Sequence, residues 1–213
     1  MIKSRIAQLI YISAFCTLGI IGAIASVGLF EAQYAKGFYV YFTNLSNYFC
    51  LGIMIAELIF VIKKLKNNEN GSVSVSPLFK FIGVIMIVVT FAVYNFLLAK
   101  DRTIYQNLSI RSILLHIILP VMYVLDWILF YDRKQIKWFY PLLTLIAPAI
   151  YAVYVFIRAW ILGGVGVVIY PYFFLDPTKI GVIGVLKWLG ILFVVFLALG
   201  YIFYAIDKIK RRK

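Results

Sequence analysis

Residues 78–99 have the sequence LFKFIGVIMIVVTFAVYNFLLA, and this stretch decides the fold class of the chain. Lys80 is the one charged residue in it. An α-helix needs about 20 consecutive, mainly apolar residues to cross the roughly 30 Å hydrocarbon core of a lipid bilayer. The stretch has that length and that composition, so it predicts a helix that spans a membrane.

Similar stretches fill most of the remaining sequence. A membrane-spanning β-barrel would show segments of about ten residues in which apolar and polar side chains alternate, and these stretches do not. Because every backbone polar group in hydrocarbon must be satisfied within the protein, we interpret them as helices. We therefore expect an all-α integral membrane protein, one domain of residues 1–213 built as a bundle of six transmembrane helices. The predicted spans are residues 6–29, 39–62, 78–99, 109–130, 138–160 and 182–206.

The composition agrees with a membrane protein. Apolar residues make up 64% of the chain and charged residues 14%, whereas soluble domains average about 45–50% and about 25%. The net charge of +13 comes from Lys and Arg residues between the apolar stretches and at the termini, instead of along one helix face. We therefore expect the lipid bilayer as a partner and do not expect a nucleic acid.

The basic residues also predict the orientation. Loops on the cytoplasmic side of a membrane protein are richer in Lys and Arg. Six spans divide the 21 basic residues into fourteen on one side and seven on the other, so we expect both termini in the cytoplasm and the protein in the inner (plasma) membrane of a bacterium. The richer side holds Lys3, Arg5, Lys63, Lys64, Lys66, Lys80, Arg133, Lys134, Lys137, Lys208, Lys210, Arg211, Arg212 and Lys213, and the poorer side Lys36, Lys100, Arg102, Arg111, Arg158, Lys179 and Lys187.

The two cysteines, Cys16 and Cys50, both lie within apolar stretches. A thiol in such a position behaves as a small hydrophobic group. The sequence therefore predicts no disulfide framework, no metal site and no cofactor.

Polar side chains inside the predicted spans need a reason, because burying them in hydrocarbon costs free energy. The predicted topology brings polar side chains from four spans to one depth in the outer leaflet, and Ser46 and Tyr94 are among them beside the seven candidate site residues. This is where we expect a site, although hydrogen bonds between helices would explain the Thr and Asn residues, and contact with lipid headgroups would explain the Arg residues. The seven candidate residues are Thr43, Asn44, Asn47, Asn95, Arg111, His116 and Arg158.

Two acidic residues lie outside this cluster. Glu57 and Asp126 are close to the inner ends of their spans. Their side chains could reach cytoplasmic water, or could pair with Lys63 or Arg133.

His116 is the only histidine in the chain, and it lies in an apolar span. A neutral histidine held by a backbone carbonyl would be structural, whereas an imidazole facing a pocket could act as a base. Pro120 removes the hydrogen bond that its N–H would give to the His116 carbonyl, so we expect a kink beside His116.

The segment between the fifth and sixth spans is aromatic. Gly163-Gly164-Val165-Gly166 is followed by Tyr170-Pro171-Tyr172-Phe173-Phe174-Leu175-Asp176. Aromatic side chains favour the membrane interface. We expect this loop to fold back as a lid over the polar cluster.

A hydroxyl and an imidazole in one low-dielectric pocket form a minimal pair of nucleophile and general base. In this interpretation Thr43 attacks an acyl carbon and His116 accepts its proton. The amides of Asn44, Asn47 and Asn95 could stabilise the oxyanion. Arg111 and Arg158 could bind an anionic part of the substrate.

Three blocks of the sequence also resemble a known family. Phe42-Thr43-Asn44-Leu45-Ser46-Asn47, the segment from Leu114-Leu115-His116 to Leu125-Asp126-Trp127, and Tyr170-Pro171-Tyr172 with Leu175-Asp176 are similar in order and spacing to the signature blocks of the Pr6Pr family of bacterial six-span membrane proteins. The resemblance extends over essentially the whole chain. That family has no settled activity.

A more distant similarity connects this family to the eukaryotic androgen-induced and androgen-dependent six-span proteins. Those proteins hydrolyse fatty acid esters of hydroxy fatty acids with a threonine in the second span and a histidine in the fourth. The resemblance implies that Thr43 is the nucleophile and His116 its partner. The eukaryotic pattern has one more residue between the His and the Pro, and its second span is less rich in amides, which allows a more polar substrate here.

The sequence leaves three functions open. The first is an intramembrane hydrolase of a lipid-like ester, reached laterally from the outer leaflet. The second is a small transporter or channel with an outer polar vestibule, and the third is a non-catalytic membrane scaffold. A transport path should continue as polar residues towards the inner leaflet, whereas the middle third of every predicted span is apolar, which favours a closed pocket.

Overall fold

The computed structural model describes residues 4–31, 34–69, 74–99, 103–104, 108–163 and 168–209. Of the residues named above, Lys3, Lys100, Arg102, the basic run 210–213 and the glycines at 164 and 166 lie outside these ranges. The described part of the chain contains helices and no strand.

Six helical spans are long and apolar enough to cross a membrane, with mean hydropathies from 1.9 to 2.6. This confirms the predicted number of spans and their approximate bounds. The spans are formed by α1 (Arg5–Val27), α2 (Phe42–Lys66), α3 (Pro77–Val93) with η3 (Tyr94–Leu98), α5 (Ile110–Ile113) with η5 (Leu114–Ile118) and α6 (Leu119–Leu129), α7 (Tyr140–Leu143) with α8 (Ile146–Ile161), and α9 (Pro177–Lys208).

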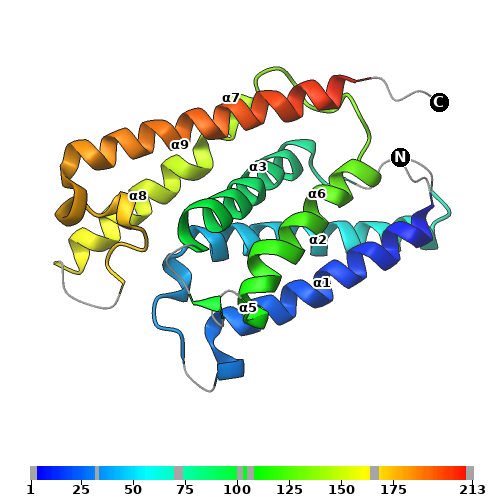
Figure 1. The fold of residues 1–213 in the computed structure, drawn as a ribbon. Coiled ribbons are helices and arrows are strands. Elements are labelled where there is room, and N and C mark those ends of the chain that lie inside the picture. The colour runs from blue at the N-terminus through cyan, green and yellow to red at the C-terminus, as the bar shows by residue number, and fades with distance from the viewer. Residues whose placement is uncertain are drawn as a thin grey trace.

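Three short 3₁₀ turns lie in the connections. They are η1 (Leu29–Glu31), η2 (Phe38–Val40) and η6 (Phe173–Leu175). All three are at the end of the bundle where α1 stops and α9 starts, which we call the loop end. The opposite end, where α1 starts and α9 stops, is the terminal end (Figure 1).

Serine and aspartate side chains set the starts of several spans. The Ser4 hydroxyl accepts a hydrogen bond from the Ala7 N–H, and Ser76, directly before Pro77, accepts one from the Phe79 N–H. Such N-caps satisfy donors that have no partner within the helix. Asp176 caps α9 in the same way, so the last span begins at Pro177 instead of the predicted residue 182. Gly181, with φ of 69°, interrupts the helical geometry between these two positions.

The helices pack as two groups (Figure 1). In the larger group α2 and α6 each contact α1 and α3, and in the smaller group α9 contacts α7 and also touches α3. The core of the larger group contains Phe15, Tyr123 and Trp127. Cys16 and Cys50 are buried in this core as free thiols, as predicted.

Small residues on α1 allow close helix packing. A Cβ atom on Gly19 would lie 2.7 Å from Leu51 Cδ1 of α2, and one on Gly22 would lie 3.1 Å from Leu115 Cδ2 of η5. Both distances are shorter than ordinary van der Waals contact. Because Gly19 and Gly22 have no side chain, the second and fourth spans can pack close to the first, near the loop end.

Candidate functional site

Five of the predicted site residues lie on three neighbouring spans in the half of the bundle near the loop end. Thr43, Asn44 and Asn47 are on the first turns of α2, Asn95 is on η3, and His116 is on η5. Their side chains are buried or, for Asn95, half-buried. These five residues therefore lie towards the same end of the bundle.

The Asn47 amide connects Thr43 to the turn that carries His116. Its Nδ2 atom donates to the Thr43 carbonyl at 2.7 Å and to the Leu115 carbonyl at 2.9 Å. Because one nitrogen bonds both oxygens, the two carbonyls cannot be further apart than the sum of these distances. The second and fourth spans are therefore fixed together between Thr43 and the residue before His116.

Both site segments on the third and fourth spans are π-helical. In η3 the Ala99 N–H bonds to the Tyr94 carbonyl, and in η5 the Leu119 N–H bonds to the Leu114 carbonyl. Wide turns of this kind are rare and are frequent at functional sites. Pro120 cannot supply an N–H to the His116 carbonyl, and the Asn95 amide donates to that carbonyl from the third span at 3.3 Å.

The imidazole of His116 packs against an aromatic ring. The rings of His116 and Tyr94 are stacked, with centroids 3.6 Å apart and planes inclined by 9°. The Tyr94 hydroxyl in turn forms a short hydrogen bond with Ser112. This stacking fixes the plane of the only imidazole in the chain.

Two further hydroxyls belong to the cluster and were not among the predicted site residues. Ser46 donates to the Thr43 carbonyl at 3.0 Å, and its hydroxyl lies 2.6 Å from that of Thr90 on α3. Both side chains are fully buried. The sequence signal for Thr90 is weak, because a single threonine in an apolar span can bond to its own helix.

Thr43 lines a pocket between the two groups of helices. The empty space in this pocket, including the part open to the outside, is about 510 Å³. The part of this space that a water molecule can enter is about 40 Å³, room for only a few water molecules. Apart from Thr43, Thr90 and the hydroxyls of Tyr151 and Tyr172, the lining is apolar. The lining residues are Phe42, Thr43, Val89, Thr90, Val93, Pro148, Tyr151, Ala152, Tyr172, Phe174, Leu175, Leu189, Leu192, Phe193 and Phe196.

The loop before α9 covers the pocket at Thr43. Tyr172, Phe174 and Leu175 are buried, and the Tyr172 ring is stacked on the Phe174 ring at 4.9 Å. The Tyr172 hydroxyl accepts the Thr43 N–H at 3.4 Å. Burial raises the pKa of Tyr172 to about 12, although hydrogen bonds to Thr43 act in the opposite direction. The phenol is therefore protonated at neutral pH.

The loop thus folds inward, but it covers the Thr43 side of the cluster. Of the described residues around the pocket, the lining set contains Thr43 and does not contain His116. Asn47 connects the Thr43 carbonyl to the Leu115 carbonyl, one residue before His116.

Asn44 and Arg158 bond to loop backbone. The Asn44 amide donates to the Phe38 carbonyl at 2.7 Å, and Arg158 Nη1 donates to the carbonyls of Val168 and Ile169 at 2.8 and 3.3 Å. The Arg158 guanidinium also lies 5.6 Å from the centre of the Tyr39 ring. These two side chains anchor the segments on either side of the pocket.

Arg111 is half-buried on the first turn of α5 and acts electrostatically on Tyr48 of α2. It does not line the pocket beside Thr43. Within the described ranges, no three His, Cys, Asp or Glu residues are grouped so that they could hold a metal ion.

The predicted environment of Glu57 and Asp126 is wrong. Both carboxylates are 2% exposed and form ion pairs with Lys80, at 2.7 and 2.6 Å, so they do not reach water. Arg133, one of the expected partners, lies over the ring of Trp127 instead. Lys80, in the first turn of α3, is itself 1% exposed, so its ammonium faces the interior of the bundle and not water.

Comparison of the chain with protein-family models, with curated proteins and with solved structures gave no match.

Proposed function

We propose that this chain is an intramembrane hydrolase of a lipid-like ester, with Thr43 as nucleophile and His116 as general base. The observation that supports the proposal most directly is the position of Thr43, one of four hydroxyl residues on the wall of a mainly apolar pocket. The apolar lining of this pocket suits a segment of an acyl chain, and the pocket must widen to admit one, since a water molecule can enter only about 40 Å³ of it. The substrate class we favour is a fatty acid ester of a hydroxy fatty acid.

The proposed reaction has two steps. The Thr43 oxygen attacks the acyl carbon while His116 accepts the threonine proton, and the alcohol leaves with that proton when the tetrahedral intermediate collapses. A water molecule, deprotonated by His116, then hydrolyses the acyl-threonine and restores Thr43. The connection through Asn47 supports this pairing, because it keeps the backbone of Thr43 close to the turn that carries His116.

Tyr172 is the donor we assign to the oxyanion. The amides of Asn44, Asn47 and Asn95 already donate to backbone carbonyls, at 2.7 to 3.3 Å. The Tyr172 hydroxyl lies beside Thr43 and retains its proton at neutral pH, since its pKa is raised. A protonated phenol can donate to a developing negative charge.

We propose that the protein is in the plasma membrane of a bacterium with both termini in the cytoplasm, supported by the excess of Lys and Arg on the terminal side. In this orientation the pocket opens in the outer leaflet. The resemblance to the Pr6Pr family and, more distantly, to the androgen-induced and androgen-dependent hydrolases supports the same nucleophile and base.

A fluorophosphonate probe tests the nucleophile. We expect purified protein in detergent to be labelled, Thr43→Ala to lose the label, and Thr43→Ser to keep part of it. His116→Gln should slow labelling by about 10²- to 10⁴-fold, the usual contribution of a general base. Thr17→Ala is the matched control, because the Thr17 hydroxyl bonds to its own helix and is exposed. Labelling that survives in Thr43→Ala would exclude Thr43 as the nucleophile.

A transporter is the second candidate. One observation favours it, namely the buried ion pairs of Glu57, Lys80 and Asp126 near the terminal end, since ionisable groups inside membrane proteins often mark ion pathways. Wild-type protein that is never labelled and hydrolyses no ester would favour this candidate or a non-catalytic scaffold.

A further inference from the structure

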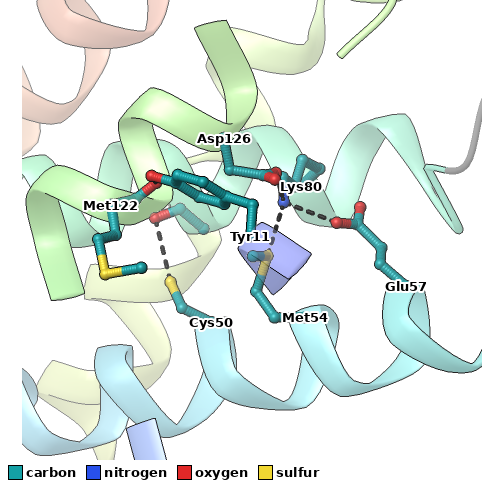
Figure 2. A network of polar contacts seen from close by, with 8 residues as sticks. Tyr11, Cys50, Met54, Glu57, Lys80, Met122 and Asp126 are labelled. Carbon is teal, nitrogen blue, oxygen red and sulfur yellow. Dashed lines mark hydrogen bonds and ion pairs between the residues drawn. The ribbon is translucent and has the colours of Figure 1, made fainter. Parts of the chain in front are cut away.

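Three charged side chains from three spans meet in the half of the bundle near the terminal end (Figure 2). Glu57 comes from α2, Lys80 from α3 and Asp126 from α6. Lys80 Nζ lies 2.7 Å from Glu57 Oε2 and 2.6 Å from Asp126 Oδ2. The three side chains are between 1% and 3% exposed, so the charges are separated from water.

The ammonium group of Lys80 uses its full set of donors. Besides the two carboxylates it contacts Met54 Sδ at 3.1 Å, and it lies 4.4 Å from the centre of the Tyr123 ring. A lysine ammonium has three N–H groups. Lys80 is therefore saturated, and it is held as a cation between two acidic groups.

The charges of this cluster do not balance. Two carboxylates face one ammonium, and no other Lys or Arg of the described chain forms an ion pair with Glu57 or Asp126. Because both carboxylates bind the same nitrogen, they are close neighbours. Two like charges at such a separation in a low-dielectric interior favour retention of a proton by one of them.

Among the described residues, Lys80 is the cation that acts electrostatically on Glu57 and on the neighbouring Tyr11, Cys16 and Cys50. The other groups that face the cluster are tyrosines, cysteines and a serine, which are neutral at neutral pH. They are Tyr11 and Cys16 on α1, Cys50 on α2, Ser74 before α3, Tyr123 on α6 and Tyr131 after α6.

One carboxylate oxygen remains open. Asp126 Oδ1 is buried and has no hydrogen-bond partner among the described residues. A metal cation would find one vacant ligand beside an ammonium that repels it, whereas a proton needs only one oxygen. The missing charge therefore fits a proton better than a metal ion.

We propose that Glu57, Lys80 and Asp126 form a proton-binding site, in which the two carboxyl groups together hold one proton that exchanges with the water at the terminal end. Lys80 lies in the first turn of α3 and Asp126 in the last turn of α6, so the site is close to that water. The site is separate from the pocket at Thr43, and its existence does not depend on the proposed hydrolase.

The same three spans carry the site at the loop end. Thr43 is on the helix of Glu57, Tyr94 follows the helix of Lys80, and His116 precedes the helix of Asp126. When the proton is bound, the net charge of Glu57, Lys80 and Asp126 together is zero, and when it is released their net charge is −1.

Infrared difference spectroscopy of the reconstituted protein tests the proposal, because a protonated carboxyl group has its own C=O band. At neutral pH we expect one such band from the wild type, which disappears in Glu57→Gln and in Asp126→Asn. Lys80→Met should double the band, since both carboxyls would then hold protons. Asp207→Asn is the matched control, because Asp207 is equally buried but accepts two backbone N–H groups instead of sharing an ammonium with a second carboxylate.

Three results would overturn the proposal. The first is a wild type with no protonated carboxyl at neutral pH. The second is a band that remains in both Glu57→Gln and Asp126→Asn. The third is a band that appears only after sodium and potassium are replaced by choline, because a metal cation would then occupy the site. The two single variants keep the test decisive if Lys80→Met fails to fold.

Discussion

The imidazole of His116 is stacked face to face on the phenol ring of Tyr94, with ring centroids 3.6 Å apart. The two residues belong to consecutive spans, and each lies in a π-helical turn. The contact holds the plane of the imidazole, so Tyr94 acts as a positioning residue for the proposed base.

Two replacements of Tyr94 distinguish the contribution of its ring from that of its hydroxyl. Tyr94→Leu removes the stacking surface, and we expect it to lower the turnover of a chromogenic ester by about 10²-fold, the cost of a misplaced catalytic group. Tyr94→Phe keeps the ring and loses only the hydrogen bond to Ser112, so turnover should change by a few-fold at most. Equal losses in both variants would contradict the positioning role.

The Asn47 bridge predicts a loss of stability. Asn47→Leu removes one hydrogen bond between helices, to the Leu115 carbonyl, and one within α2, to the Thr43 carbonyl. A bond between membrane helices contributes about 0.6 kcal/mol. We therefore expect the free energy of unfolding in mixed detergent to fall by about 1 kcal/mol. Asn67→Ala, at an exposed position after α2, is the control and should leave it unchanged. An unchanged Asn47→Leu variant would mean that the bridge does not stabilise the fold.

The raised pKa of Tyr172 predicts a loss of stability at alkaline pH. Its pKa changes from an ordinary value of 10.0 to about 12 in the folded chain, because the phenol is buried. Between these values the unfolded chain has lost the proton and the folded chain retains it, so the folded state becomes less stable as the pH rises. Below this window Tyr172 contributes no pH dependence.

The comparison of wild type with Tyr172→Phe isolates this effect from the other tyrosines. Relative to the variant, the wild type should lose on the order of 2 kcal/mol of unfolding free energy across the window. Parallel stability curves for the two proteins would show that the Tyr172 phenol is not buried.

The orientation in the membrane can be measured by cysteine labelling. Asn67 and Lys179 are exposed at opposite ends of the bundle, and the native cysteines are buried. In intact cells a membrane-impermeant maleimide should label Lys179→Cys and leave Asn67→Cys unlabelled until the cells are opened. The reverse pattern would place the termini outside the cytoplasm.

The spans were predictable because each is a property of local sequence. Their lengths and apolar composition are fixed by the thickness of the bilayer, and the order of six spans determines which polar residues share a depth. Thr43, Asn47 and His116 could therefore be assigned to one end of the bundle before their contacts were known.

The partners of charged residues were not predictable in the same way. Lys80 was counted as a boundary residue, because a long side chain near a helix start usually extends to water. Its direction is decided by which face of α3 meets α2 and α6, and that depends on packing among helices distant in sequence. The hydrogen bonds from Arg158 to the carbonyls of Val168 and Ile169 could not be predicted for the same reason, because they depend on how the loop packs against its helix.

The last helix, α9, is the least enclosed of the six spans, with only 11% of its most apolar stretch buried. It contacts the rest of the bundle at points along its length, by Trp188 with Phe173 and by Phe196 with Phe42. Near its end, Asp207 bonds to the backbone of Lys134 and Ile136. The inner side of the same helix forms a wall of the pocket through Leu189, Leu192 and related residues. The helix α9 alone thus separates the pocket from the outer surface of the bundle. In a membrane, a long-chain molecule that passed beside α9 would enter the pocket from the lipid without contact with water.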